Sequence, residues 1–275
     1  MKTNNLVWAV VILGTIAVGS SVWLYGRMSP VALLVSVVVS AVLGGGVCGL
    51  LAASSLWPRT GGDRAAWLWA SLAWGGGICV VVVRAVFLGP GTLAVKAGWE
   101  QAEYSFGGAW PEEIMKTLGI VVIAYTCRCV TRPWHVFLTG IFIGLGFELV
   151  ENAQYAVGMA VDSPVSDLRG ALTSWLIRLL FGLFAHSLYS GIIGWILGLA
   201  LTGEHRSAGR RIAIALAGFG AGFGLHFAWN YQFSSDVVNG VWLLGCAVVM
   251  YGTVVWIFFK SRRLARRERP RPAQA

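Results

Sequence analysis

Ionisable side chains interrupt the apolar stretches of this chain, first in the segment PEEIMK at 111–116. Glu112 and Glu113 lie four and three residues before Lys116, so on a helix the ammonium group can contact either carboxylate. Pro111 suits the first position of a helix, where the helix dipole also favours acidic side chains. Two neighbouring carboxylates in a poorly solvated place should differ in proton affinity, which suits general acid–base catalysis. The alternative is a capped helix start that carries a surface ion pair.

A second polar group lies in GLGFELVENAQY at 144–155. Glu148, Glu151 and Asn152 are spaced three and four residues apart, so one face of a helix can hold all three. The surrounding apolar run at 134–159 is long enough to cross a bilayer, where a carboxylate costs about 2.5–3.5 kcal/mol and therefore indicates a function. The structural alternative is that these carboxylates only form ion pairs with basic residues elsewhere in the bundle (Arg84, Lys116 or Arg178).

Two further apolar runs carry histidines. Arg178 and His186 lie in the run at 170–202, and His226 lies in the next run, four residues before Asn230. That spacing places His226 and Asn230 on one helical face, so the amide can orient the imidazole or bind a substrate carbonyl. A single histidine on an apolar helix is usually a core residue with its hydrogen bonds satisfied.

Counting along the helices places the candidate side chains at one depth. Glu113 is 16 residues from Cys129, and Glu151 is 17 from Trp134. His186 and His226 are likewise each 16 residues from the expected cytoplasmic ends of their helices. At a rise of 1.5 Å per residue, all four lie about 25 Å from those ends. Acid and imidazole groups on four helices in one layer predict a catalytic site.

The composition identifies the surrounding elements as membrane-spanning helices. Of 275 residues, 57% are hydrophobic and only 12% are charged, and the mean hydropathy is +0.71. Eight apolar runs predict an all-α, polytopic transmembrane bundle of about eight helices. The bundle is expected over 1–259, followed by a basic cytoplasmic tail at 260–275. The runs are at 5–25, 31–57, 65–88, 111–129, 134–159, 170–202, 210–232 and 239–259.

The formal charge of +9 is explained by topology and not by nucleic-acid binding. Fifteen basic residues fall on the side of the two termini and three on the other, so the positive-inside rule predicts that both termini are cytoplasmic. The first run is expected to be a retained helix because no clear signal-peptide cleavage site follows it. The segment at 89–110 is expected to lie at the outer interface, and all five cysteines are interpreted as structural.

Four of these segments resemble the motifs of one family. PEEIMK matches the EExxK element of the PrsW family of intramembrane proteases, which are relatives of the CAAX prenyl endopeptidases. GLGFELVENAQY resembles its GxGFxxxEN element, with Phe147 and Glu151-Asn152 in the matching places. RLLFGLFAHSLYSGIIGW resembles the third element, and LHFAWN the fourth. The resemblance covers about 111–232. Phe184-Ala185 stands where the third element commonly has Pro-Gly, and the fourth has Asn230 in place of Asp.

The resemblance implies an intramembrane endopeptidase, of either metallo- or glutamate type, that cleaves membrane-anchored proteins in a bacterial cell membrane. Glu112 and Glu113 are expected to activate water, and Glu151 is the third acid. His186 and His226 either bind a divalent metal such as zinc together with Glu151, or stabilise an oxyanion with help from Asn230. The remaining supporting residues are Lys116, Phe147, Glu148, Asn152 and Arg178.

Sequence alone leaves the metal open, because no HExxH motif occurs and a glutamate–histidine pair can hydrolyse peptides without metal. A different class of protein would also fit the buried charges: a non-catalytic transporter or scaffold with a buried polar network. No internal repeat of the kind found in transporters is visible. An intramembrane enzyme acting on lipid would use similar acid–base groups. The expected partners are the bilayer and a membrane-anchored protein substrate, with no nucleic acid.

Overall fold

The computed structural model describes residues 3–59, 62–203 and 207–268, and within them the protein is helical with no β-strand. Seven helical stretches are long and apolar enough to cross a membrane. One of them, Arg64–Lys96, is formed by several consecutive helical segments. The chain is therefore a multi-pass, all-α integral membrane protein, as predicted.

The first half contains the helices that lead up to the acidic motif. In chain order they are α1 (Thr3–Met28), α2 (Pro30–Ala52), α3 (Arg64–Ala73), the π-helical η1 (Trp74–Cys79), α4 (Val80–Val86), α5 (Leu88–Lys96), the 3₁₀ turn η2 (Glu100–Ala102), the π-helical η3 (Ser105–Ala109) and α6 (Trp110–Thr126). The second half contains α7 (Pro133–Val161), α8 (Asp167–Phe181), α9 (Ala185–Thr202), α10 (Ala208–Asn230) and α11 (Asp236–Arg267).

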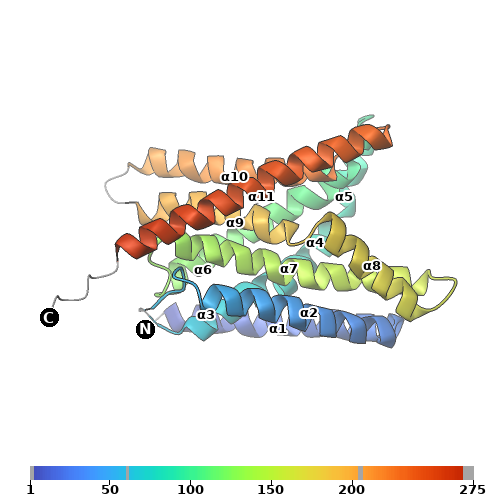
Figure 1. Cartoon of the computed structure of the whole chain (residues 1–275), viewed down its shortest axis with the longest axis horizontal. Coiled ribbons are helices and arrows are strands. Elements are labelled where there is room, and N and C mark those ends of the chain that lie inside the picture. The colour runs from blue at the N-terminus through green and yellow to red at the C-terminus, as the bar shows by residue number, and fades with distance from the viewer. Residues whose placement is uncertain (1–2, 60–61, 204–206, 269–275) are drawn as a thin grey trace.

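Helix α7 forms the centre of the bundle. It lies between α1–α3 on one side and α9–α11 on the other (Figure 1). In its most apolar stretch 83% of the residues are buried, against 17% for α10 and for α11, whose outward faces are suited to lipid. The GxGFxxxEN motif therefore lies in the core of the protein, where its polar groups need protein partners.

Helix α1 begins, and α11 ends, at the same end of the bundle (Figure 1). Seven spans alone would leave the two ends of the chain on opposite sides. The eighth pass is α6, whose 17 residues reach the lower limit for a spanning helix and which packs against α7. The arrangement agrees with about eight helices. The cytoplasmic placement of this end remains a prediction from the basic residues.

The helix boundaries differ from the predicted runs at three places. The run at 170–202 is two helices, separated at 182–184 where Phe184 adopts a left-handed backbone conformation (φ 60°). The segment at 89–110 is mostly helical, because Pro90 falls in the first turn of α5 and breaks no hydrogen bond. Helix α11 continues into the predicted tail as far as Arg267, since the tail has no Pro or Gly at 260–267. The part of that tail at 269–275 lies outside the described residues.

The five cysteines are all free thiols. Cys127 and Cys129 lie in the connection between α6 and α7, where burial raises the pKa of the two thiols to about 11 and about 12. Both thiols therefore stay protonated at neutral pH, in which form they are weak nucleophiles. This agrees with a structural role.

Glycines allow α7 and α9 to pack backbone against backbone. A Cβ at Gly140 would collide with the carbonyl oxygen of Ser190, and one at Gly144 with the carbonyl oxygen of His186. Small residues at such contacts are a common feature of packed membrane helices. Gly144 therefore brings α7 directly against the turn that carries a candidate catalytic histidine.

Gly140→Ala is expected to lower the free energy of unfolding by about 1–3 kcal/mol, because the added methyl group must push α9 away from α7. Thermal unfolding of the purified protein in detergent measures this loss. Gly158→Ala is the matched control on the same helix, since nothing outside the adjoining backbone of α7 lies within 4 Å of the added Cβ. Equal stabilities of the two variants would contradict the close helix contact.

Candidate active site

The ammonium group of Lys116 connects three of the predicted site residues. Lys116 is fully buried in the first turns of α6, and its Nζ atom lies 2.9 Å from Glu112 Oε2, 3.0 Å from Glu113 Oε1 and 2.9 Å from His186 Nδ1. Its three N–H donors thus each have an acceptor. The Phe147 ring, 4.1 Å from the same nitrogen, adds a cation–π contact. The i,i+3 and i,i+4 ion pairs expected from the sequence are present, and they are buried.

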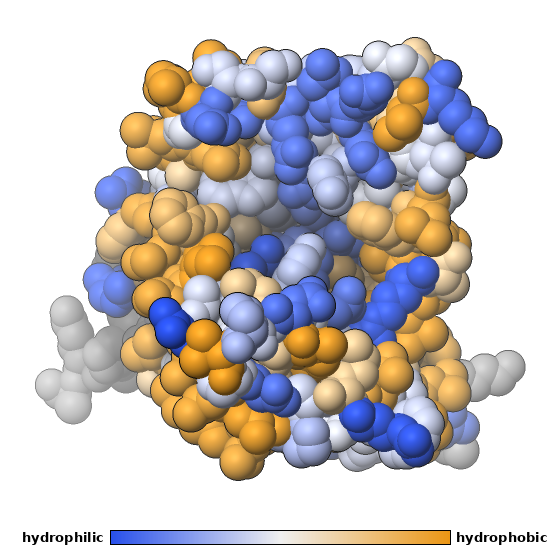
Figure 2. Space-filling view, turned by 90° about the vertical axis from the view of Figure 1, so that its right-hand side faces the viewer, coloured by the Kyte–Doolittle hydropathy of each residue, from blue (hydrophilic) through white to orange (hydrophobic). Residues whose placement is uncertain are grey.

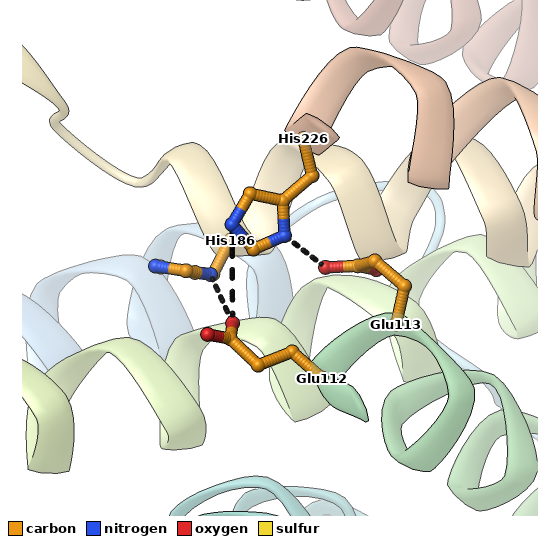
Figure 3. Close-up of side chains that lie close together, drawn as sticks. All are labelled: Glu112, Glu113, His186 and His226. Atoms are coloured by element: carbon orange, nitrogen blue, oxygen red, sulfur yellow. Dashed lines mark hydrogen bonds and ion pairs between the residues drawn. The ribbon is translucent and has the colours of Figure 1, made fainter. Parts of the chain in front are cut away.

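His226 lies on the other side of Glu113. Its Nδ1 atom is 2.8 Å from Glu113 Oε1, and its Nε2 atom is 3.9 Å from Glu112 Oε2 (Figure 3). The Asn230 amide nitrogen, one turn further along α10, is 3.2 Å from Nε2 and also donates to the backbone carbonyl of Tyr104 at 3.3 Å. The imidazole is therefore held on both nitrogens.

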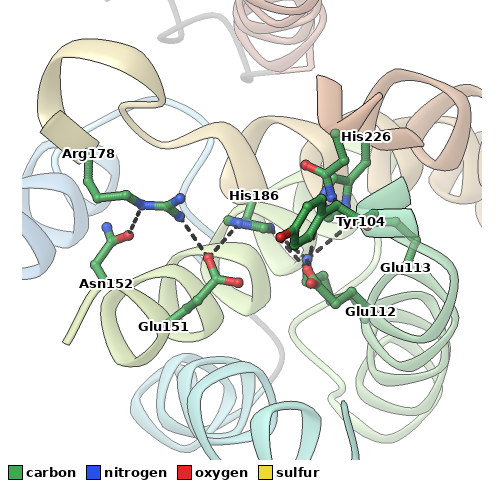
Figure 4. Close-up of polar contacts among 10 residues, drawn as sticks. Tyr104, Glu112, Glu113, Glu151, Asn152, Arg178, His186 and His226 are labelled. Carbon is green, nitrogen blue, oxygen red and sulfur yellow. Dashed lines mark hydrogen bonds and ion pairs between the residues drawn. The ribbon is translucent and has the colours of Figure 1, made fainter. Parts of the chain in front are cut away.

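His186 joins this cluster to a second one on α7 and α8 (Figure 4). Its Nε2 atom is 3.0 Å from Glu151 Oε2, and its Nδ1 atom is 3.4 Å from Glu112 Oε2. Arg178 donates to Glu151 at 2.7 Å and to the Asn152 carbonyl oxygen at 2.6 Å. Four motifs far apart in the sequence therefore meet in one hydrogen-bonded network.

The donors around each histidine determine which ring nitrogen carries hydrogen. An ammonium group can only donate, so His186 Nδ1 accepts from Lys116 and Nε2–H donates to Glu151. The Asn230 amide likewise donates to His226 Nε2, so Nδ1–H donates to Glu113. In both rings, the nitrogen that bears the lone pair also lies close to Glu112 Oε2, at 3.4 Å for His186 and 3.9 Å for His226.

A cavity of about 930 Å³ reaches this network. Glu112, Glu151, His186 and His226 all line it, whereas Glu113 and Lys116 lie behind its wall. Other lining residues come from the end of α10 and the start of α11, at the end of the bundle away from the two chain ends. Figure 2 shows that this end is hollowed near its centre and that hydrophilic residues line the hollow. Water can therefore approach Glu112 from that end.

Two residues of the site were not singled out in the sequence. The Tyr189 ring stacks on His226 with ring centroids 4.8 Å apart, and Tyr104 supplies the carbonyl that accepts from Asn230. Tyr189 lies three residues after His186, so helical spacing could have placed it on the same face. The position of Tyr104, between η2 and η3, has no such signal.

The residues present fit a divalent metal ion. Glu112, Glu113, His186 and His226 are all buried, and each offers a ligand atom within 4.8 Å of the other three. Carboxylate oxygen and imidazole nitrogen are the usual non-sulfur ligands of zinc. Glu113 Oε2 is buried and has no hydrogen-bond partner, as expected for an atom that awaits a ligand. Glu151, predicted as a ligand, lies outside this group on the far side of His186.

Comparison with known families agrees with this chemistry. The model of the PrsW family of intramembrane metalloproteases matches residues 63–259. The chain belongs to this family. No curated protein and no solved structure matches the chain.

Membership of the family makes the chain an intramembrane endopeptidase and an integral membrane protein. The match is wider than the resemblance at 111–232, since it begins just before α3 and ends within α11. Helices α3, α4 and α11 therefore belong to the family domain, although the sequence shows no motif in them. For α4 and α11 this agrees with the structure, since residues of both helices line the cavity.

Lys116→Met is expected to reduce the free energy of unfolding of the metal-free protein by about 3–5 kcal/mol. The reason is that it leaves two buried carboxylates without their cation. The matched control is Arg132→Gln, which removes an exposed ion pair with Glu268 and should cost less than about 1 kcal/mol. Unfolding curves of both variants in the same detergent measure the difference. Equal losses would contradict the role of Lys116 as the buried counter-ion.

Proposed function

We propose that this protease hydrolyses peptide bonds of membrane-anchored proteins, using the glutamates and histidines of α6, α7, α9 and α10. The observation that carries the proposal is the position of Glu112, whose carboxylate lies at the cavity wall between two histidines. A carboxylate and imidazoles around one small wet space are suited to acid–base hydrolysis.

Glu112 is the proposed general base. It lines the cavity, where a water molecule can reach it, and its Oε2 atom forms an ion pair with Lys116 Nζ at 2.9 Å. In the first step it takes a proton from the attacking water, and later it returns this proton to the leaving amine. Glu113 does not line the cavity. Its Oε1 atom is proposed to orient His226 through Nδ1–H, which leaves Oε2, an atom without a partner, as its ligand atom.

His186, His226 and Glu113 are the residues that would hold a metal ion, leaving Glu112 free as the base. Such an ion supplies Lewis-acid polarisation of the substrate carbonyl and a more acidic water. When ionised, the three carboxylates Glu112, Glu113 and Glu151 carry one negative charge more than Lys116 and Arg178 can neutralise. A divalent cation would more than offset this single negative charge. Glu151 is proposed to orient His186 from behind, as outer partners of metal-binding histidines commonly do.

Asn230 is proposed to donate the N–H group that points at His226 Nε2 to the carbonyl oxygen on which negative charge develops. Both line the cavity, and the Asn230 amide is a donor on the same helical face as His226. A fixed donor of this kind stabilises a tetrahedral intermediate more than the planar ground state.

Membrane-anchored substrates need a path from the bilayer to the cavity. Phe181 at the end of α8 and Leu243 on α11 both line the cavity, and Phe181 is also 69% exposed on the outer surface of the bundle. The wall between α8 and α11 is thus the proposed entrance for an unwound segment of the substrate. The resemblance to bacterial members of the family supports a bacterial cell membrane as the setting.

The test is cleavage of a panel of single-pass membrane segments by the protein reconstituted in liposomes, with product masses read by mass spectrometry. A defined cut within or beside the spanning segment is the expected result. A folded protein that cleaves no member of the panel, but conducts or exchanges an ion, would favour a transporter with a buried polar network.

A further inference from the structure

The start of α9 is an unusual helix terminus. Helix α8 ends at Phe181, and after three residues α9 begins at Ala185, so that His186 is its second residue. Phe184 is the N-cap residue, and its side chain makes no capping hydrogen bond. It is also the one non-glycine residue in the described parts of the chain that has a positive φ, at 60°. Something outside the segment must therefore hold this turn in place.

Glu148 is the side chain that reaches this turn. It projects from α7 and is 3% exposed. Gly140 packs against the backbone of Ser190 and Gly144 against that of His186, so Glu148, one helical turn beyond Gly144, faces the residues that lead into α9. The backbone N–H groups of Phe184 and Ser187 are the donors near its carboxyl group. One turn earlier on α7, Gly144 packs directly against the backbone of His186 and Ser187. Helix α7 thus contacts the first turn of α9 at two successive levels.

The other possible roles of Glu148 fit the contacts less well. It does not line the cavity, and no hydrogen bond joins it to either site histidine among the described residues. Arg178, the nearest cation on α8, directs its Nε and Nη2 atoms to Asn152 and Glu151. What remains is a side-chain oxygen acceptor at a helix N-terminus that lacks a cap of its own and whose first N–H groups have no partner within the helix.

We propose that Glu148 is a positioning residue that caps α9 from the neighbouring helix. By fixing the rotation of the first turn, it directs His186 Nδ1 toward Lys116 and Glu112 and Nε2 toward Glu151. This inference rests on the proposed function only for its effect on catalysis. Its effect on the His186 ring can be measured without any substrate.

The test compares three variants. Glu148→Ala removes the cap and is expected to lower kcat by about 10–100-fold, the range that applies to groups that orient a site histidine. KM should stay unchanged, because the residue does not touch the cavity.

Glu148→Gln keeps an oxygen acceptor for the two N–H groups, and its amide nitrogen can take the place of Oε2, which has no partner. This variant should therefore retain most of the activity. Ser29→Ala is the matched control, since it removes the cap of α2.

Two measurements distinguish a positioning role of Glu148 from a purely stabilising role. Thermal unfolding should show a loss of stability for both Glu148→Ala and Ser29→Ala. Nitrogen NMR of ¹⁵N-histidine-labelled protein should show altered His186 ring signals for Glu148→Ala only. Unchanged His186 signals in Glu148→Ala, or a Glu148→Gln variant as impaired as Glu148→Ala, would overturn the proposal. A wild-type protein that cleaves nothing would instead count against the proposed function, and the ring signals would still decide the role of Glu148.

Discussion

Glu112→Gln is expected to lower kcat by about 10²–10⁴-fold, the range that a general base contributes, with little change in stability or metal content. The amide cannot take a proton from water, although it keeps the size of the side chain and can still accept from Lys116 Nζ. Lys116 also retains Glu113 as its charged partner. The variant should therefore fold and bind substrate normally.

Glu100→Gln is the control for this prediction. Glu100 is an exposed acid in η2 that does not line the cavity. The activity of the Glu100→Gln variant should therefore equal that of the wild type. Initial rates on the same single-pass substrate, corrected for the folded fraction, give the comparison. If Glu112→Gln retained wild-type activity, Glu112 could not be the base, and Glu151 would be the remaining carboxylate in the cavity.

His186→Ala and His226→Ala are each expected to abolish both stoichiometric metal binding and cleavage. Each variant removes one of the two imidazoles that lie within ligand distance of the buried carboxylates. Loss of an outer partner of a metal ligand already costs about 10–100-fold in affinity, so loss of the ligand itself should cost more. Elemental analysis and activity measured on the same preparations test the prediction.

His135→Ala provides a matched control for the two histidine variants. His135 is a buried histidine at the other end of α7, where its Nδ1 accepts from the backbone N–H of Thr131. Its removal should leave both metal content and activity unchanged. A histidine variant at 186 or 226 that kept its metal and lost only activity would mean that the imidazoles stabilise charge on the substrate and do not bind the metal.

Periodicity and depth predicted which side chains come together in the bundle. The spacing of Glu112, Glu113 and Lys116 gave the ion pairs, because i,i+3 and i,i+4 contacts depend only on the geometry of one helix. Counting along the helices placed Glu151 and His226 level with them, since spanning helices share one pair of interfaces. The network that contains all four motifs agrees with this placement.

Contacts that depend on tertiary packing could not be predicted. The break at Phe184 has little local signal, since phenylalanine has no preference for left-handed backbone and Gly182 alone does not end an apolar run. The third contact of Lys116, to His186, depends on how closely α6 and α9 approach. For the same reason Glu151 was expected among the metal ligands, whereas Glu112 and Glu113 are the acids grouped with the two histidines.

The central claim is that this site cleaves peptide bonds with the help of a metal held by α6, α9 and α10. The most direct test is a titration of zinc into metal-free wild-type protein reconstituted with a single-pass substrate, with bound metal and product measured at each step. We expect cleavage to rise in proportion to bound zinc and to saturate at one ion per chain. Glu112→Gln should bind the same single ion and remain inactive. Full cleavage by protein without bound metal would contradict the metal role and leave a glutamate–histidine mechanism. Zinc that binds with no cleavage at any occupancy would contradict the protease assignment of the site.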